Sequence, residues 1–231
     1  MSSNAFLSRA LGKTICPLLP RRWRLGFRYR LAAADGLLEP ELRRLPRLVS
    51  KTDVALDIGA NIGFYAYRMS QIFSKVYAFE INDEVTGELQ SYNPGNITIM
   101  PVGLSSQAGE STLHIPVLND LPLIGWASLA PGNYPEATGE LTKKVKIATL
   151  DSFQLNNVSF MKIDVEGHEL HVLEGARETL AKNRPLVLIE IKENNRAAVI
   201  QLFSELNYVP RKLSDLLGVE GSPDNSFFVP A

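Results

Sequence analysis

Short apolar runs alternate with amphipathic segments through most of the chain after Asp53. The apolar runs are rich in β-branched and aromatic residues and have the length of buried strands. They cover residues 54–57, 76–80, 97–100, 159–163, 186–191, 208–212 and 226–229. Helical spacing of apolar side chains recurs in residues 62–73, 83–92, 168–182 and 196–206. This alternation is typical of βαβ units and predicts an α/β fold around a largely parallel sheet.

The helical periodicity disappears between residues 102 and 149, where glycine, serine and proline punctuate the chain. Within it, residues 111–116 and 144–147 resemble paired strands. The stretch 118–134 has no clear periodicity and is apolar in places, which suits a lid over a bound acceptor. A loop whose Trp126 fills part of the core fits the same stretch, so both interpretations stay open.

The first 50 residues follow a different pattern. Prolines separate short apolar stretches there, which predicts short helices wrapped on the outside of a main domain. This segment holds ten Lys/Arg against three Asp/Glu, so the rest of the chain carries a net charge of about −8 within the total of −1. We therefore divide the chain into a basic helical N-terminal appendage, residues 1–50, and a main domain, residues 51–231.

The densest basic stretch, residues 21–30, mixes arginines with Trp23, Phe27 and Tyr29. Segments that bind membrane surfaces or nucleic acids have this composition. A solvated helix that packs its aromatic side chains on the main domain has it too. We expect at most a weak membrane-surface contact from this segment. Nucleic acid is not an expected partner, because the motif for holding a flipped base is absent after the strand at 159–163.

Composition places the chain among ordinary soluble proteins, with 45% hydrophobic and 21% charged residues. The single cysteine, Cys16, excludes an intramolecular disulfide, and the three histidines form no zinc-type cluster with it. No stretch approaches the roughly 20 apolar residues that span a bilayer. The first ten residues lack the apolar core of a secretory signal. These features predict a cytoplasmic protein.

The turn after the first predicted strand, Asp57 to Gly63, is a candidate cofactor site. Ligands of open parallel sheets bind at the carboxyl ends of the strands, and the first strand-to-helix turn is the usual place for a nucleotide-like cofactor. Gly59 and Gly63 allow the backbone to turn sharply and approach a ligand closely. Asp57 would repel the diphosphate of a dinucleotide but attract the ammonium group of a methionine moiety.

A second acid strengthens this interpretation. Glu80 ends the second strand, 23 residues beyond Asp57, where a carboxylate can accept hydrogen bonds from both ribose hydroxyls. Each acid alone has a simpler explanation, Asp57 as a helix cap and Glu80 as a surface acid. Together they favour S-adenosylmethionine as the cofactor.

Three segments together resemble the FkbM family of methyltransferases. They are Val54–Gly63, Val76–Glu80 and Met161–Glu169. Shorter matches follow in the order that the family shows, at 102–105, 127–129, 149–152, 172–176 and 184–185. The resemblance runs from about Asp53 to Ile191 and leaves the N-terminal 50 residues and the C-terminal tail unmatched.

The resemblance implies a class I methyltransferase fold, with a seven-stranded, mostly parallel sheet and helices on both faces. It also implies S-adenosylmethionine as methyl donor and, usually, O-methylation of a hydroxyl on a sugar or secondary metabolite. The acceptor would thus be a small molecule or a glycan. Carried over by motif, the expected cofactor-binding residues are Asp57, Gly59, Asn61, Gly63, Glu80, Val102, Gly103 and Leu104.

The expected catalytic residues follow the strand at 159–163. Methyl transfer to an alcohol needs alignment of the acceptor, and a base within hydrogen-bonding reach of its hydroxyl assists by roughly two to four orders of magnitude. Asp164 stands at the rim of the sheet, and Glu166 and His168 lie in the following turn. His168 has a suitable ordinary pKa, but related sequences differ at this position, so Asp164 is preferred. A capping role at the helix N-terminus is the alternative, especially for Glu166.

Three further alternatives stay open. Asp164 and Glu190, with Asn194 nearby, could hold a divalent cation, although we expect no metal because such sites need several converging oxygens. A module that binds S-adenosylmethionine without turnover would share the cofactor residues. An NAD(P)-dependent oxidoreductase would use the same turn for a dinucleotide.

Overall fold

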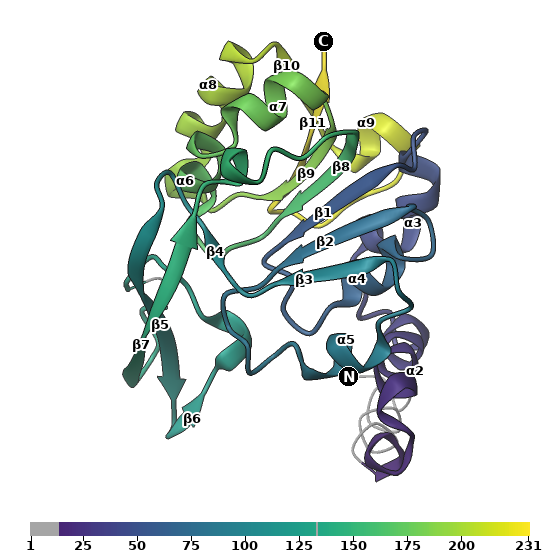
Figure 1. Cartoon of the computed structure of the whole chain (residues 1–231), viewed down its shortest axis with the longest axis vertical. Coiled ribbons are helices and arrows are strands. Elements are labelled where there is room, and N and C mark those ends of the chain that lie inside the picture. Colours follow the sequence, from purple (N-terminus) through teal and green to yellow (C-terminus); the bar gives the residue numbers. More distant parts are fainter. Residues whose placement is uncertain (1–13, 133) are drawn as a thin grey trace.

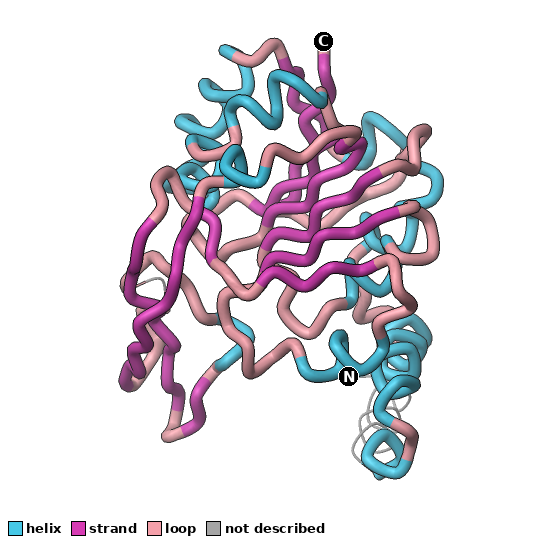
Figure 2. Tube along the Cα trace, in the orientation of Figure 1, coloured by secondary structure: helices cyan, strands magenta, loops and turns pink. Residues whose placement is uncertain are grey.

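A sheet of seven strands forms the centre of the molecule in a computed structural model that describes residues 14–132 and 134–231. The strand order is β10-β11-β9-β8-β1-β2-β3 (Figures 1 and 2). Strands β3, β2, β1, β8 and β9 are parallel, and β11 is antiparallel to both β9 and β10. The bounds are β1 Val54–Ile58, β2 Lys75–Phe79, β3 Ile97–Met100, β8 Val158–Ile163, β9 Leu186–Glu190, β10 Tyr208–Arg211 and β11 Asn225–Pro230. The predicted α/β class is confirmed.

Helices cover both faces of this sheet because the central strands are apolar on both sides. Leu56 and Ile58 of β1 join one buried cluster and Ala55 joins the other. The first cluster packs against α6 (Glu169–Glu174), α7 (Arg177–Asn183) and α8 (Arg196–Glu205). The second packs against α2 (Arg21–Ala34), α3 (Pro40–Leu48), α4 (Phe64–Met69), α5 (Gly87–Tyr92) and α9 (Leu213–Leu217). The two core clusters therefore stabilise opposite faces of the sheet.

The described part of the N-terminal segment is helical and contributes to this core. It comprises the short η1 (Cys16–Leu18) followed by α2 and α3. Leu25 and Leu45 are fully buried. The buried Glu41 carboxylate accepts hydrogen bonds from the Ser222 backbone at 2.8 Å and its hydroxyl at 3.0 Å. The expected short helices are thus present, but they share a core with the sheet.

A second sheet stands beside the carboxyl ends of the central strands (Figure 1). Its order is β4-β7-β5-β6. The predicted pair of strands at 111–116 and 144–147 is confirmed inside the antiparallel β5–β7 pair, where Ser111 is opposite Val145. The bounds are β4 Gly103–Leu104, β5 Gly109–Leu118, β6 Leu121–Pro122 and β7 Gly139–Ala148. Three short helical turns complete the fold, η2 Ile124–Trp126, η3 Leu150–Phe153 and η4 Glu193–Asn195.

Three predicted helices are shorter than expected. The helix predicted at 62–73 begins only at Phe64, because Gly63 adopts a left-handed φ of 95°. The one predicted at 83–92 is helical only from Gly87, after a turn. The prediction of a single helix at 168–182 was wrong, because the chain forms two helices, α6 and α7, that are separated at Gly175. A Cβ on Gly175 would lie 2.1 Å from the Ser105 carbonyl oxygen. At the break, the backbone of Gly175 therefore packs directly against the backbone of Ser105.

Replacing Gly175 with alanine should therefore destabilise the fold. We expect a loss of about 1–3 kcal/mol in the free energy of unfolding, because the added methyl group meets a rigid carbonyl. Gly87→Ala is the matched control, since a Cβ there meets nothing within 4 Å. It should be neutral or stabilise by up to about 1 kcal/mol. Urea unfolding followed by circular dichroism measures both, and equal effects of the two substitutions would contradict the packing argument.

Candidate functional site

A pocket opens at the carboxyl ends of β1, β2 and β8. It brings together most of the residues that the sequence singled out, although they come from separate parts of the chain. These are Gly59, Asn61, Glu80, Val102, Gly103 and Leu104 from the expected cofactor set, with Asp164, Glu166 and His168 from the expected catalytic set. Asp57 and Gly63 are not among the lining residues. The side chain of Leu89 lies where a Cβ of Gly63 would be, so that glycine serves the packing of α5.

The turn after β1 is held against the neighbouring strand ends. Gly59 and Ala60 donate backbone hydrogen bonds to the Phe79 carbonyl, each at 3.0 Å. A Cβ on Gly59 would lie 1.7 Å from the carbonyl oxygen of Asp164, and Gly59 has a φ of 78°. Only glycine fits at this position. The turn therefore meets the end of β8 directly and leaves its remaining side open to the pocket.

Glu80 reaches the pocket from the end of β2 with its carboxylate already oriented. One oxygen accepts the Asn61 backbone N–H at 2.7 Å and the other accepts that of Asn82 at 2.8 Å. Burial raises the pKa of Glu80, and these two hydrogen bonds oppose that rise. Since each carboxylate oxygen has two acceptor sites, Glu80 can still accept two hydroxyl groups. These acceptor positions fit the ribose hydroxyls of the expected cofactor.

The η2 turn lies over the same pocket. The Asn61 side-chain amide donates to the Gly125 carbonyl at 3.1 Å, and that of Asn82 donates to the Ile124 carbonyl at 3.3 Å. The free cavity beneath is about 60 Å³, whereas small-molecule sites usually exceed about 300 Å³. The pocket in this conformation is therefore smaller than a cofactor requires, and η2 is one of the segments that cover it.

Trp126 at the end of η2 does not fill the core. Its side chain is 43% exposed and stacks on Tyr134 with ring centroids 5.0 Å apart. The core-filling interpretation of this stretch was wrong, because the stretch runs along the second sheet and its tryptophan packs on another surface aromatic. The pair presents an aromatic face beside the pocket.

Asp57 points away from the pocket, because alternate residues of β1 face opposite sides of the sheet. It is completely buried, and neither oxygen has a hydrogen bond of regular geometry to the described part of the chain. Burial raises its pKa to about 6, and the Lys162 ammonium group opposes that rise. A direct contact between Asp57 and the cofactor stays a prediction.

Lys162 on β8 lies opposite Asp57 in the strand register. Its Nζ donates to Asp164 Oδ2 at 2.8 Å and lies 4.8 Å from the centre of the Tyr65 ring. Burial alone would lower the pKa of Lys162, but the Asp164 and Asp57 carboxylates outweigh it and the pKa is raised. The second Asp164 oxygen, Oδ1, has no hydrogen-bond partner in the described residues. Lys162 thus holds one oxygen of Asp164, and the other is a buried oxygen whose acceptor capacity is unused within the described residues.

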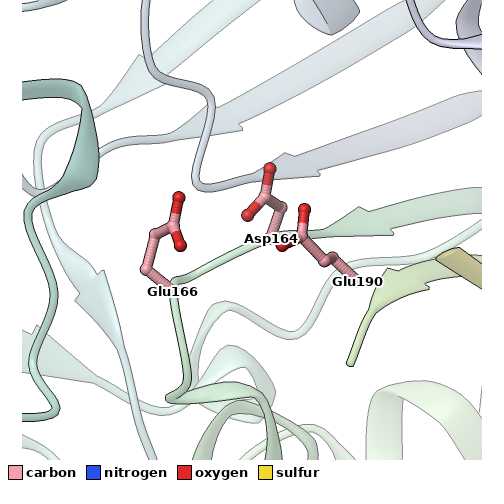
Figure 3. Close-up of side chains that lie close together, drawn as sticks. All are labelled: Asp164, Glu166 and Glu190. Atoms are coloured by element: carbon pink, nitrogen blue, oxygen red, sulfur yellow. The ribbon is translucent and has the colours of Figure 1, made fainter. Parts of the chain in front are cut away.

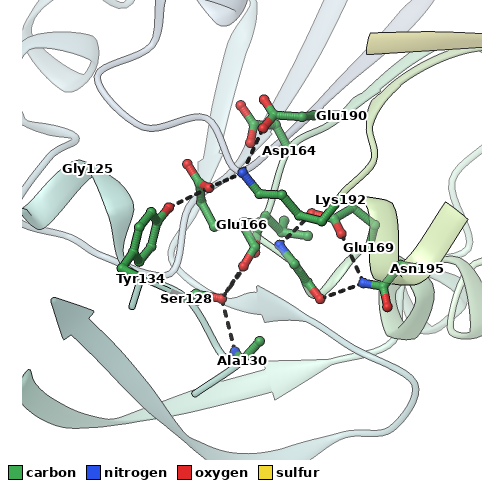
Figure 4. Close-up of polar contacts among 12 residues, drawn as sticks. Gly125, Ser128, Ala130, Tyr134, Asp164, Glu166, Glu169, Glu190, Lys192 and Asn195 are labelled. Carbon is green, nitrogen blue, oxygen red and sulfur yellow. Dashed lines mark hydrogen bonds and ion pairs between the residues drawn. The ribbon is translucent and has the colours of Figure 1, made fainter. Parts of the chain in front are cut away.

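Three carboxylates meet at the pocket edge. Asp164, Glu166 and Glu190 each present an oxygen within 4.8 Å of the others (Figure 3). Lys192 Nζ lies 3.2 Å from Glu166 and 3.0 Å from Glu190 (Figure 4). The sequence had suggested Asp164 and Glu190 with Asn194 as metal ligands. In the structure Glu166, rather than Asn194, is the third group close to Asp164 and Glu190. The expectation that no metal binds here stays a prediction.

Glu166 does not cap the helix that follows it. Its carboxylate accepts the Tyr134 hydroxyl at 2.6 Å and pairs with Lys192. Burial and the Glu166 carboxylate both raise the pKa of Tyr134, so the tyrosine stays a donor. The capping alternative for Glu166 was therefore wrong, because its side chain turns toward the pocket edge.

The backbone of this turn is strained and held by side chains. Glu166 and Gly167 have positive φ values of 52° and 94°. The buried Glu169 carboxylate accepts the Gly167 N–H at 2.7 Å, and the Asn195 amide donates to the Gly167 carbonyl at 2.9 Å. From the loop after η2, the Ser128 hydroxyl donates to the Glu166 carbonyl at 2.6 Å (Figure 4). These three contacts fix where Glu166 points.

His168 lies deeper in the pocket. Its Nε2 is 2.9 Å from the Ser105 hydroxyl oxygen, and its ring stacks on His171 with centroids 4.4 Å apart. Burial, and then His171, lower the pKa of His168 to about 4. The ring is therefore neutral at physiological pH, and its protonation is disfavoured.

Several site residues were missed by sequence reasoning. They are Ser105, Ser128, Tyr134, Lys162 and Lys192. Lys162 and Lys192 carried a usable signal, because a lysine in an apolar strand, or just after an acid that ends one, implies a charged partner. Ser128 and Tyr134 carried none, since their role depends on how the second sheet meets the first.

The lowered pKa of His168 predicts acid sensitivity. The unfolded chain binds a proton at this histidine near pH 6.5, and the folded chain does so only near pH 4. Stability from this residue is thus present above pH 6.5 and is lost as the pH falls toward 4, by about 3 kcal/mol at most. Urea unfolding between pH 4 and 7 should show a flatter pH profile for His168→Gln. Identical profiles for the wild type and His168→Gln would refute the assignment.

Comparison with known proteins agrees with this geometry. The family model of the FkbM methyltransferase domain matches residues 57–210. Hexuronic acid methyltransferase AglP of Haloferax volcanii is 30% identical over 156 residues, which cover 65% of this chain and 60% of that relative. The chain thus spans less than two thirds of that relative's length.

Solved structures share the fold. FkbM methyltransferase from Methylobacillus flagellatus KT superposes with a TM-score of 0.52 at 17% identity, over 77% of this chain and 43% of that chain. SMU.1697c from Streptococcus mutans, in complex with SAH, superposes with a TM-score of 0.51 at 13% identity, over 83% and 96%. The class I methyltransferase fold is thereby confirmed. Because the family model covers most of the chain and the pocket, the protein belongs to the FkbM methyltransferase family and has S-adenosylmethionine as its cofactor.

Proposed function

We propose that this protein transfers a methyl group to a hydroxyl of a sugar, with Asp164 as the general base. The proposal rests on the hydrogen bonding of the Asp164 carboxylate at the pocket edge. One of its oxygens is held by Lys162 at 2.8 Å, and the other has no partner among the described residues. Asp164 thus combines a fixed carboxylate with a buried oxygen that has unused capacity to accept a proton.

The surroundings of Asp164 support a sugar as acceptor. The stacked rings of Trp126 and Tyr134 lie beside Glu166, through the Tyr134 hydroxyl. An aromatic face suits the apolar side of a pyranose ring, and carboxylates accept hydrogen bonds from its hydroxyls. The name of the archaeal relative, a hexuronic acid methyltransferase, supports the same substrate class.

Methyl transfer chiefly requires that the acceptor hydroxyl be aligned with the methyl group. Bound S-adenosylmethionine supplies a methyl group that its sulfonium already activates. Gly59 and Glu80 would hold the cofactor. Asp164 would take the acceptor proton as the C–O bond forms and the methyl–sulfur bond breaks, with S-adenosylhomocysteine as the leaving group. Lys162 keeps Asp164 oriented, and Trp126 and Glu166 hold the sugar. His168 is neutral and lies next to Ser105, but its pKa, lowered to about 4, makes it a weaker base than an ordinary histidine, which favours Asp164 in this role.

Asp164→Asn should reduce turnover by about two to four orders of magnitude. S-adenosylhomocysteine binding should persist, because the cofactor contacts at Gly59 and Glu80 are intact. The assay incubates the full chain with labelled S-adenosylmethionine and free uronic acids or glycans, and calorimetry measures cofactor-product affinity. Asp224→Asn, at an exposed position outside the pocket, is the control. Binding without any methylated product from the wild type would favour a module without turnover, and full activity in Asp164→Asn would exclude Asp164 as the base.

Removal of divalent cations should leave turnover unchanged. Lys192 Nζ already lies 3.2 Å from Glu166 and 3.0 Å from Glu190, so an ammonium group supplies the positive charge at these carboxylates. The measurement is the methylation rate after dialysis against a chelator. A loss that added Mg²⁺ reverses would instead assign Asp164, Glu166 and Glu190 to a metal site.

A further inference from the structure

Helix α2 has one face fixed against the protein. Leu25 is fully buried, and the Tyr29 ring lies 5.8 Å from Phe64 and 4.9 Å from Tyr67. The helix also packs along α5 at one end of the molecule (Figure 1). Its orientation is therefore set by packing, and its outer face is a defined surface.

That outer surface carries positive charge that the protein leaves unbalanced. The helix contains arginines but no acidic residue. Arg24 is engaged with the carbonyls of Pro17 and Leu19, and Arg28 pairs with Glu88 at 3.1 Å. Arg21, Arg22 and Arg30 are exposed, and within residues 14–132 and 134–231 no carboxylate pairs with them.

Apolar side chains lie next to these arginines. Leu18 in η1 is 83% exposed, Trp23 is 56% exposed and Ile15 is 37% exposed. The Arg22 guanidinium lies 5.4 Å from the centre of the Trp23 ring. Large aliphatic and aromatic groups are rarely left in water beside one another without a partner.

A groove runs beside the same helix face. Its volume is about 400 Å³, and its lining includes Trp23, Phe27, Tyr67 and Tyr92, with Arg22 and Arg30. Gly26 makes room for it, since a Cβ there would lie 3.1 Å from the Tyr67 hydroxyl oxygen. Guanidinium groups therefore surround an aromatic hollow.

We propose that η1 and α2 form a docking surface for a membrane that contains anionic lipids. Arg22 and Arg30 contact the lipid phosphates, while Leu18 and Trp23 enter the boundary between headgroups and acyl chains. Among the described residues, no helix is long and apolar enough to cross a membrane, so the contact is peripheral. Exposed aliphatic side chains gain nothing from contact with the phosphate backbone of a nucleic acid but can insert among acyl chains. The surface therefore favours lipid over nucleic acid.

The charge distribution orients the protein on such a surface. Residues from 51 onward carry a net charge of about −8, so an anionic membrane repels the main domain and attracts α2. This inference is independent of the proposed acceptor, because it concerns a different face of the molecule.

Vesicle binding of the full chain tests the proposal. The protein should sediment with vesicles of phosphatidylcholine and phosphatidylglycerol but not with phosphatidylcholine alone, and binding should weaken with salt. Arg22→Glu with Arg30→Glu should lower the vesicle partition coefficient by about 10- to 100-fold. Lys144→Glu with Lys146→Glu, on exposed positions of β7, changes the net charge equally and should retain binding.

Fluorescence locates the contact. The chain has two tryptophans, so a Trp126→Phe variant reports Trp23 alone, and its emission should shift to the blue with anionic vesicles. S-adenosylhomocysteine binding by every variant verifies the fold. The proposal is overturned if no anionic vesicle binds, if both charge-reversed pairs bind equally, or if duplex nucleic acid binds while vesicles do not. None of these results bears on methyl transfer, which is measured separately.

Discussion

The buried ammonium group of Lys162 is the interaction on which the site depends. A charge removed from water must be compensated, and losing one partner of a buried pair costs about 3–5 kcal/mol. Asp164 compensates the Lys162 charge at the pocket edge. Asp57 and the Tyr65 ring compensate it on the face of the sheet that α4 covers. The same charge therefore stabilises the centre of the fold and orients a side chain of the site.

This cluster also connects the N-terminal helices to the pocket. The Tyr65 hydroxyl donates to the Glu39 carboxylate at 2.8 Å, and the Asn225 amide donates to it at 2.9 Å. Glu39 directly precedes α3. A chain of polar contacts thus runs from the segment before α3, through Tyr65 and Lys162, to Asp164. The N-terminal helices support the site from behind as well as covering the sheet.

The parts of the site that were predictable from sequence are those set by local backbone requirements. Gly59 and Glu80 follow strands and occupy positions where a turn or a strand end dictates the residue type, so pattern and spacing found them. Gly175 was misjudged because its helix breaks against the Ser105 carbonyl, a contact between segments far apart in the chain. Tyr134 and Ser128 were missed for the same reason. The charge of Asp57 beside the turn predicted a cofactor contact that stays untested, whereas its position opposite Lys162 depends on the pairing of β1 with β8 and was not predicted.

The two asparagine side chains that hold η2 also connect the cofactor turn to the acceptor side of the pocket. Asn61 belongs to the cofactor turn and Asn82 follows Glu80, while η2 ends at Trp126. A cofactor entering beneath η2 would separate these hydrogen bonds and move the aromatic face on which an acceptor would rest. The two asparagines therefore couple occupancy of the cofactor turn to the position of the aromatic face, so that the cofactor and the acceptor would bind interdependently on this scaffold.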